Sequence, residues 1–503
     1  MSGEKGLNLH LGLAIAAGAI GSSFQHGWAT GVVNNPQWFV MTWIRGCNAS
    51  LPDLETPEQS DEDNEFITNG TESNIALNLP HNQYSNCKMT KIEVTAIWSL
   101  VVSIFCVGGI IGGCSVGMIS SKLGRRGGLL FNNIFMVLGG VLMVGSKYAA
   151  SYEMLIAGRF FIGVNAGISA GISPMYLTEI SPTALRGAVG TFYQLIMTIA
   201  ILLSQIIGME EVLGNEWGWS ILFGLTMIPG LFQLITLPFC PESPKYLLLD
   251  KGEKGRAMNA LSWLRGKEDL HAEMSEMEME QERMKITPRI TFKEMFTNGE
   301  LRAPLIIALM MMLAQQLSGI NAAIFFSTDI FKDAGLSAQN AQSATLGMGG
   351  MNVLMTIISL ILIERAGRKT LMLSGLVVML ICTTSLLICL IIKTKIASYL
   401  SIIFVIMFVV GFATGPGSIP WFFVNELFQQ SARPMAASMA VAINWAANYV
   451  VAQCFPIAQL AIGPYVFIVF ITTQIFFIAY VSLKVPETKN KTIDEIFAQF
   501  QRN

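Results

Sequence analysis

The chain has 503 residues, of which 52% are hydrophobic and 13% are charged, and its formal net charge is −2. A soluble domain carries about 25% charged residues, so this composition indicates a membrane protein. The near-neutral charge gives no reason to expect a nucleic-acid partner. The sequence contains no evident nucleophile–base pair, phosphate loop or metal-ligand cluster, so we expect neither an enzyme nor a bound cofactor or metal.

Twelve apolar stretches are long enough to cross a bilayer, which requires about 20 helical residues. In chain order they lie at 10–33, 93–118, 128–147, 153–177, 187–208, 218–239, 303–327, 342–363, 370–392, 398–424, 436–458 and 463–484. The first has no basic run before it and no small-residue cleavage site after it, which indicates a retained helix. Lysine and arginine concentrate in the loops on the side of the N-terminus, which places both termini in the cytoplasm.

A long polar segment at 41–92 follows the first span and lies outside the cell by this topology. It contains glycosylation sequons at Asn48 and Asn69, and such motifs are used only on the outer side. Chance occurrence is the alternative, because three-residue motifs are common. Cys47 and Cys87 lie in the same segment, where an oxidising exterior permits a disulfide.

Three charged signatures occur twice, in the same order and about 245 residues apart, which indicates a duplicated unit typical of secondary transporters. They are Gly124-Arg125-Arg126 and Gly367-Arg368-Lys369, the runs Glu179 to Arg186 and Glu426 to Arg433, and Pro241-Glu242-Ser243 and Pro486-Glu487-Thr488. All map to the predicted cytoplasmic rim. Acid–arginine pairs there favour a salt-bridge latch that joins the halves when the cavity faces out and releases them when it faces in. The alternative is a role in topology and solubility alone. The predicted latch residues are Arg125, Arg126, Glu179, Arg186, Glu242, Glu364, Arg368, Glu426, Arg433 and Glu487.

The duplication divides the chain into an N-terminal six-helix half at 1–239, a linker at 240–301, a C-terminal six-helix half at 302–484 and a tail at 485–503. In the linker, residues 267–285 mix Glu, Met and Arg as a surface helix does. We expect the linker to bridge the halves on the cytoplasmic side, with regulation as the alternative role.

Amide side chains inside membrane helices are costly unless they are paired or face water. Nine occur in or beside the predicted spans: Gln194, Gln205, Gln315, Gln316, Asn321, Asn352, Asn444, Asn448 and Gln453. Interhelical hydrogen bonding is the ordinary explanation for a lone amide, and we interpret Gln205 and Gln453 in this way. Gln315, Gln316 and Asn321 are harder to explain so, because positions 316 and 321 fall on neighbouring helix faces with Gly319 between them.

The tenth span contains a run from Gly415 to Pro420 that breaks a helix. Pro420 removes a backbone donor, and the glycines loosen the rest of the run. A broken helix in a membrane is tolerated where it lines a cavity, and it is a natural hinge. The alternative is a simple kink, which is disfavoured because Trp421 follows directly.

Nine motifs, in order and on the expected sides, resemble those of the sugar porters of the major facilitator superfamily, in particular the facilitative hexose transporters of animal cells. They are Gly158-Arg159-Phe160, Pro174-Met175-Tyr176, Glu179 to Arg186, Pro241 to Lys245, Gln315 to Asn321, Glu364 to Arg368, Gly415 to Trp421, Asn444-Trp445 and Pro486 to Lys489. The similarity covers the chain except 41–92. It implies an all-α membrane protein of twelve transmembrane helices in two six-helix halves, with a cytoplasmic helical linker. It also implies alternating-access sugar transport across the plasma membrane, for which one chain suffices.

The resemblance also implies a sugar site. Its members are Gln194, Gln315, Gln316, Asn321, Asn352, Trp421 and Asn444, with Asn448 in the same neighbourhood. Amides that donate and accept, with an aromatic face for the C–H side of the ring, suit a neutral sugar covered in hydroxyls. Phe325, Phe326, Gly415, Pro416 and Pro420 match gating positions, and the two phenylalanines replace tyrosines that are common in the family.

Ala29 stands where proton-coupled sugar porters carry a carboxylate, and no Asp or Glu lies deep in a predicted span. A proton-driven mechanism normally needs such an acid, so we expect passive uniport. His26 is the titratable residue nearby, and it is either pH-responsive or a hydrogen-bonded structural residue. A proton-coupled symporter is the alternative transporter. A non-transporting sugar sensor is the alternative from another class, and the short tail disfavours it.

Hexose choice depends on departures from the glucose-selective pattern. Residues 312–314 read Met-Leu-Ala instead of Gln-Leu-Ser, Ala413 replaces a usual Glu, and Ser418 replaces a usual proline. A lost hydroxyl or carboxylate changes discrimination by about 1–3 kcal/mol. We expect D-glucose, with galactose or fructose as open alternatives.

Overall fold

The structure is a computed structural model, and it describes residues 8–46, 89–182, 185–266, 270–286, 290–428, 432–489 and 495. The sequons at Asn48 and Asn69 and the cysteines Cys47 and Cys87 lie outside these ranges, as do the side chains of Arg186 and Glu364.

Six crossings form the N-terminal half. They are α1 (Leu9–Ala19), the π-helical turn η1 (Ile20–Phe24) and α2 (Gln25–Gly31); the two arms of α4 (Lys91–Tyr148); α5 (Tyr152–Ile180); α6 (Arg186–Ile207); and α7 (Trp219–Gly224), α8 (Met227–Thr236) and η2 (Leu237–Phe239). The arms of α4 meet at Gly124, which has φ +81°. This left-handed conformation favours glycine, and the chain reverses direction there.

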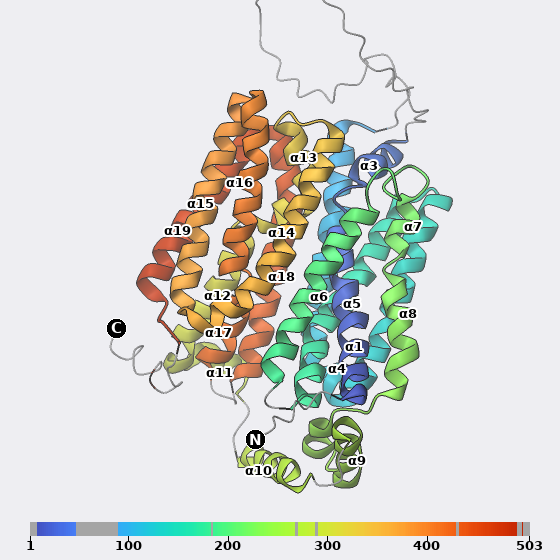
Figure 1. The fold of residues 1–503 in the computed structure, drawn as a ribbon, viewed down its shortest axis with the longest axis vertical. Coiled ribbons are helices and arrows are strands. Elements are labelled where there is room, and N and C mark those ends of the chain that lie inside the picture. Colours follow the sequence, from blue (N-terminus) through green and yellow to red (C-terminus); the bar gives the residue numbers. More distant parts are fainter. Residues whose placement is uncertain are drawn as a thin grey trace, which may run out of the picture.

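Six further crossings form the C-terminal half. They are α12 (Gly299–Leu317) with α13 (Ile320–Asp333); α14 (Ala338–Arg365); α15 (Arg368–Ile392); α16 (Lys395–Thr414) with α17 (Ile419–Leu427); α18 (Arg433–Ile462); and, after η4 (Gly463–Val466), α19 (Phe467–Lys484). Figure 1 shows the two halves side by side, with the start of α1 and the end of α19 toward the same end of the bundle.

Short helices lie at the two ends of the bundle. At one end is α3 (Gln37–Arg45), which the sequence did not predict. At the other end are η3 (Tyr246–Asp250), α9 (Lys254–Arg265), α10 (His271–Ile286) and α11 (Phe292–Thr297) (Figure 1). Of these, η3 and α9 pack with the N-terminal half, where Asn8 Nδ2 donates to the carbonyl of Leu264. The helix α10 packs against η3, and α11 packs against α12 and α18.

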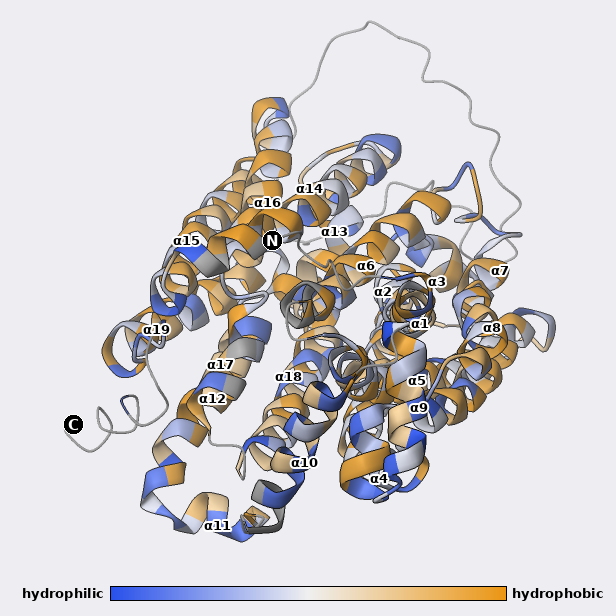
Figure 2. Ribbon diagram, turned by 60° about the horizontal axis from the view of Figure 1, so that its bottom comes forward, coloured by the Kyte–Doolittle hydropathy of each residue, from blue (hydrophilic) through white to orange (hydrophobic). Residues whose placement is uncertain are grey.

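The composition of the helices suits a membrane. Seven continuous helical stretches are long and apolar enough to cross one, and two of them, of 58 and 52 residues, are long enough to cross twice. The runs 9–31, 186–207 and 338–365 complete twelve crossings within the described chain. Figure 2 shows apolar residues along the helices and hydrophilic residues gathered around α10 and α11. Large apolar side chains such as Ile235 and Ile381 are exposed, which suits contact with lipid tails.

Four predicted spans are interrupted within the described chain. The sixth is divided into α7 and α8 by the turn at Leu225–Thr226. The first contains the π-helical turn η1, and the tenth is broken between Thr414 and Ile419, where the sequence predicted a break. The seventh is broken after Leu317 and then continues to Asp333, beyond its predicted end. This extension brings Asp329 into α13, but Asp329 lies four residues before the helix ends at Asp333 and is therefore not deep within the span.

Candidate functional site

Four buried amides meet at the centre of the C-terminal half. Gln315 and Gln316 lie near the end of α12, Asn321 lies at the start of α13, and Asn444 lies on α18. Asn444 Nδ2 donates to Gln315 Oε1 at 2.7 Å, and Gln316 Nε2 donates to Asn444 Oδ1 at 2.9 Å. Gln316 Oε1 in turn accepts from Asn321 Nδ2. The structure therefore brings these four predicted residues into one hydrogen-bonded network, which we call the amide network.

The amide network also contacts the broken tenth span. Gln315 Nε2 donates to the carbonyl oxygens of Pro416 at 2.8 Å and Gly417 at 2.7 Å. These carbonyls lie between the end of α16 and the start of α17, where the regular helical pattern is interrupted. One amide therefore links the two helix breaks of this half.

The break between α12 and α13 depends on Gly319. Its φ is +97°, a conformation that side chains other than glycine rarely adopt. A Cβ atom at this position would lie 3.0 Å from the Phe470 ring, so the packing of α19 also requires glycine. The break separates the amides of α12 from Asn321 by one tight turn.

The other four predicted site residues lie outside the hydrogen bonds of the amide network as the described residues form it. Asn448 is buried, and its Oδ1 has no hydrogen-bond partner among the described residues. Gln194 and Asn352 are half-buried. The side chain of Trp421 is on α17 and is 39% exposed. The structure thus assembles the central four amides, and the sugar-binding roles of all eight predicted residues stay predictions.

The two predicted gating phenylalanines are fully buried. Their ring centroids are 6.1 Å apart in a T-shaped arrangement, and Phe326 stacks on Phe455 of α18 at 5.7 Å. Phe455 also packs against Phe467 and Phe470 of α19. Phe325 and Phe326 therefore belong to an aromatic cluster that lies about one helical turn beyond Asn321 along α13.

At the end of the bundle that carries α3, a set of polar contacts joins the halves, and the sequence analysis missed it. Asn34 Nδ2 donates to the Ile324 carbonyl and to Ser327 Oγ, both at 2.7 Å. Thr328 Oγ1 donates to Asn35 Oδ1 at 3.1 Å, and Gln37 bonds to Asp329. We call these bonds the polar closure. The run Asn34-Asn35-Pro36-Gln37, directly after an apolar span, is the sequence signal that could have identified it.

At the opposite end, the charged signatures of the N-terminal half bind one another. Arg125 Nε lies 2.9 Å from Glu179 Oε2, and its Nη1 lies 2.8 Å from Asp250 Oδ2. Glu242 Oε1 accepts from the backbone N–H groups of Arg125 and Arg126 at 3.0 Å each. This carboxylate thus caps the helical arm that begins after Gly124, where negative charge is favourable.

The C-terminal half repeats this arrangement. Arg368 Nε lies 3.1 Å from Glu426 Oε1, and Glu487 accepts from the backbone N–H groups of Arg368 at 2.8 Å and Lys369 at 3.1 Å. The hydroxyls of Ser243 and Thr488 donate to Glu179 and Glu426 respectively. The duplicated sequence signatures therefore form the same set of contacts twice: an arginine–glutamate ion pair, a glutamate that caps a helix, and a hydroxyl that donates to the paired glutamate.

The contacts just described do not join the two halves, so they are not the predicted latch in this conformation. Each of them lies within one half or joins it to the linker or tail that follows it, while Arg126 and Arg433 donate to the carbonyls of Pro238 and Phe428. With the polar closure formed at the α3 end, the structure describes a state that is shut at that end. A latch that forms in another state stays a prediction.

Twelve crossings in two similar halves, with a buried amide network and helix breaks at the centre, define a secondary transporter. Residues 14–500 match the family described as sugar (and other) transporter, and the chain belongs to this family. The fold class and the family that the motifs indicated are thereby confirmed.

Relatives and solved structures agree with this assignment. The chain is 41% identical over 501 residues to facilitated glucose transporter member 3 of solute carrier family 2 from Canis lupus familiaris, covering 99% of this chain and 94% of the relative. It is 40% identical to member 1 from Gallus gallus, covering 100% and 95%. A partially occluded, inward-open xylose transporter from E. coli superposes with a TM-score of 0.76 at 20% identity, over 96% of this chain and all of that one, and shares the fold.

Proposed function

We propose that the protein carries D-glucose across the plasma membrane by facilitative transport with alternating access. The amide network is the observation that supports this most directly. Its donors and acceptors are buried and bond mainly to one another, so a ligand rich in hydroxyls can replace these bonds without leaving buried polar groups unpaired. The names of full-length relatives at 40–42% identity support glucose as that ligand.

In this proposal, sugar hydroxyls replace the contacts among Gln316, Asn321 and Asn444. Asn448 supplies a further acceptor through its unpaired Oδ1. The half-buried amides Gln194 and Asn352 add hydrogen bonds, and Trp421 packs against the C–H face of the ring.

The surroundings of Ala29 support uniport. Arg159 is completely buried, and its Nη1 donates to the Ala29 carbonyl at 2.7 Å while its Nε donates to the Val101 carbonyl at 3.2 Å. The guanidinium also lies 4.7 Å from the Phe105 ring. Ala29 offers this arginine a main-chain oxygen and no carboxylate that could take up a proton. His26 lies nearby and bonds to Tyr193 at 3.3 Å, which favours its structural role.

The contacts at the two ends of the bundle support alternating access. The polar closure holds the halves together at the α3 end, which we place outside the cell, and the linker and both termini lie in the cytoplasm. When the polar closure opens, the charged signatures of the two halves approach one another at the cytoplasmic end. A two-state exchange of this kind is what carriers of this architecture require.

D-glucose is expected to stabilise the purified protein in detergent, whereas L-glucose is expected to have no effect. At a concentration 100-fold above Kd, binding to the folded state alone adds about 2.7 kcal/mol of stability. Thermal melting with each enantiomer measures this. Equal shifts of Tm for the two enantiomers, or none for D-glucose, would contradict the proposed substrate.

A further inference from the structure

In each half, a glutamine on the last crossing hydrogen-bonds to the first crossing, at the place where the helix of that first crossing is irregular. On α8, Gln233 Nε2 donates to the Ala17 carbonyl at 3.1 Å and to Ser22 Oγ at 2.9 Å, beside the π-helical turn η1. On α19, Gln474 Nε2 donates to the Ser318 carbonyl at 2.8 Å, at the break between α12 and α13. Both glutamines are fully buried, so these bonds are shielded from water.

The third crossing of each half supplies a further partner. Asn133, on the second arm of α4, donates to Gln233 Oε1 at 2.9 Å. Thr383, on α15, accepts from Gln474 Nε2 at 3.1 Å through its hydroxyl. In both halves, therefore, the first crossing supplies the irregular helix, the third supplies a polar partner and the sixth supplies the glutamine. This correspondence is expected if the contact was duplicated together with the six-helix unit.

In the C-terminal half this support acts on the candidate sugar site. Gln474 and the neighbouring Thr473 hold two successive carbonyls, those of Ser318 and Leu317, and the Thr473 bond is 2.8 Å long. The break thus held lies between Gln316 and Asn321, which face each other across it. The angle of the break sets the distance between these two amides, so a group that fixes the break positions the site.

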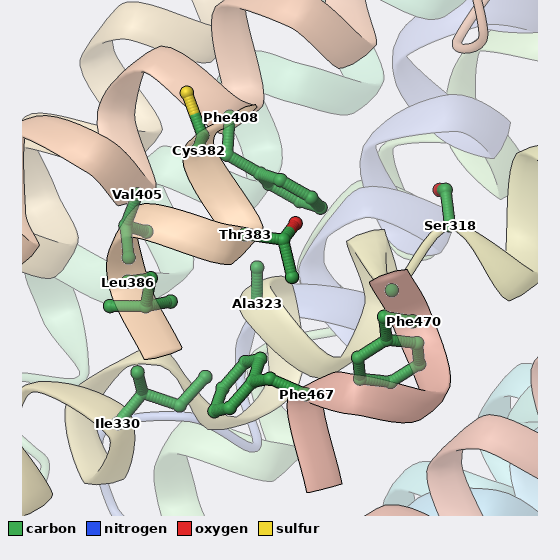
Figure 3. Close-up of a pocket in the computed structure, with 11 residues that line it drawn as sticks. Ser318, Ala323, Ile330, Cys382, Thr383, Leu386, Val405, Phe408, Phe467 and Phe470 are labelled. Atoms are coloured by element: carbon green, nitrogen blue, oxygen red, sulfur yellow. The ribbon is translucent and has the colours of Figure 1, made fainter. Parts of the chain in front are cut away.

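The two halves differ in what lies next to this support. In the N-terminal half, Gln25 and Asn133 fill the space beside Gln233 with amide groups. In the C-terminal half, the space near Gln474 is a small, mostly apolar cavity between α13, α15, α16 and α19 (Figure 3). Gly319, Ala323 and Thr383 line it, and Gln474 Oε1 has no hydrogen-bond partner among the described residues. The break in α12–α13 therefore borders a small cavity, and from the α19 side it is held by the Gln474 amide and the Thr473 hydroxyl.

We propose that Gln474 is a positioning residue for sugar binding. Its amide holds the Ser318–Gly319 break in the geometry that joins Gln316 to Asn321. The inference depends on the proposed transport of glucose, and the wild-type protein tests that function separately.

Gln474→Leu removes the donor while keeping most of the side-chain volume. We expect the KM for D-glucose uptake into proteoliposomes to rise about threefold to tenfold, the change that loss of a buried hydrogen bond produces. Thr472→Val is the matched control, because Thr472 is exposed on the same helix and bonds to its own helix at the Ile468 carbonyl. The KM of this control is expected to equal that of the wild type.

A double-mutant cycle with Asn321→Ala separates positioning from general stability. If Gln474 acts through Asn321, the KM change from Gln474→Leu disappears when Asn321 is already absent. Additive changes would overturn the inference, as would an unchanged KM for Gln474→Leu while the wild type transports glucose.

If Gln474→Leu does not fold, Thr383→Val weakens the same contact and is expected to raise KM in the same direction. An unchanged KM for that variant would likewise overturn the inference. Absence of glucose transport by the wild type would instead refute the proposed function.

Discussion

Replacing Gln316 by alanine is expected to lower kcat/KM for D-glucose by about 100-fold, because each lost or orphaned buried hydrogen bond costs about 1–3 kcal/mol. Gln316 donates to Asn444 and accepts from Asn321, so its removal leaves both partners with unpaired polar atoms. In the proposed complex it also removes contacts with the sugar. Initial rates of uptake over a range of glucose concentrations measure the effect.

Gln339→Ala is the matched control for this prediction. Gln339 is also a glutamine on a helix of the C-terminal half, but it is exposed in the first turn of α14. Its replacement is expected to leave kcat/KM within about twofold of the wild type, as is usual for exposed side chains. If Gln316→Ala and Gln339→Ala transport glucose equally well, the amide network is not the sugar site.

Replacing Gly319 by valine is expected to lower the free energy of unfolding by about 3 kcal/mol or more, through backbone strain and overpacking together. The φ of +97° disfavours a β-branched residue, and the added Cβ would meet the Phe470 ring at 3.0 Å. A thermal melt of the purified variant and its yield of monodisperse protein measure the loss.

Gly350→Val provides the comparison for Gly319. Gly350 lies in α14 with helical geometry, and no atom lies within 4 Å of a Cβ built there. This variant is expected to melt close to the wild type. A Gly319→Val variant that melts with Gly350→Val would contradict the view that the α12–α13 break requires a left-handed residue.

Hydropathy and turn chemistry were sufficient to predict the twelve crossings and the break after Gly415. Apolar length is a property of each segment, and the Gly-Pro run specifies its own interruption. The break at Ser318–Gly319 was not predicted, because a lone glycine in an apolar helix is usually tolerated. The break is stabilised by the packing of Phe470 and by the hydrogen bond from Gln474, and both residues belong to a helix about 150 residues further along the chain.

The candidate site was predictable to a similar extent. Amide chemistry and the resemblance identified Gln315, Gln316, Asn321 and Asn444, which the structure joins in one network. The charged signatures were expected to join the halves in one state and release them in another, and here Arg125 and Arg368 pair with Glu179 and Glu426 of their own halves. Sequence reveals that acids and arginines share an end of the bundle, but the choice among nearby partners depends on the conformational state.

The most direct test of the proposed function is uptake of labelled D-glucose by proteoliposomes that contain the purified protein, with L-glucose as the control and unlabelled galactose and fructose as competitors. The flux is measured with and without an imposed proton gradient. We expect stereoselective uptake that stops at equilibrium and is the same under both conditions. Accumulation above equilibrium driven by the proton gradient would contradict uniport, and absence of stereoselective flux would contradict glucose transport itself.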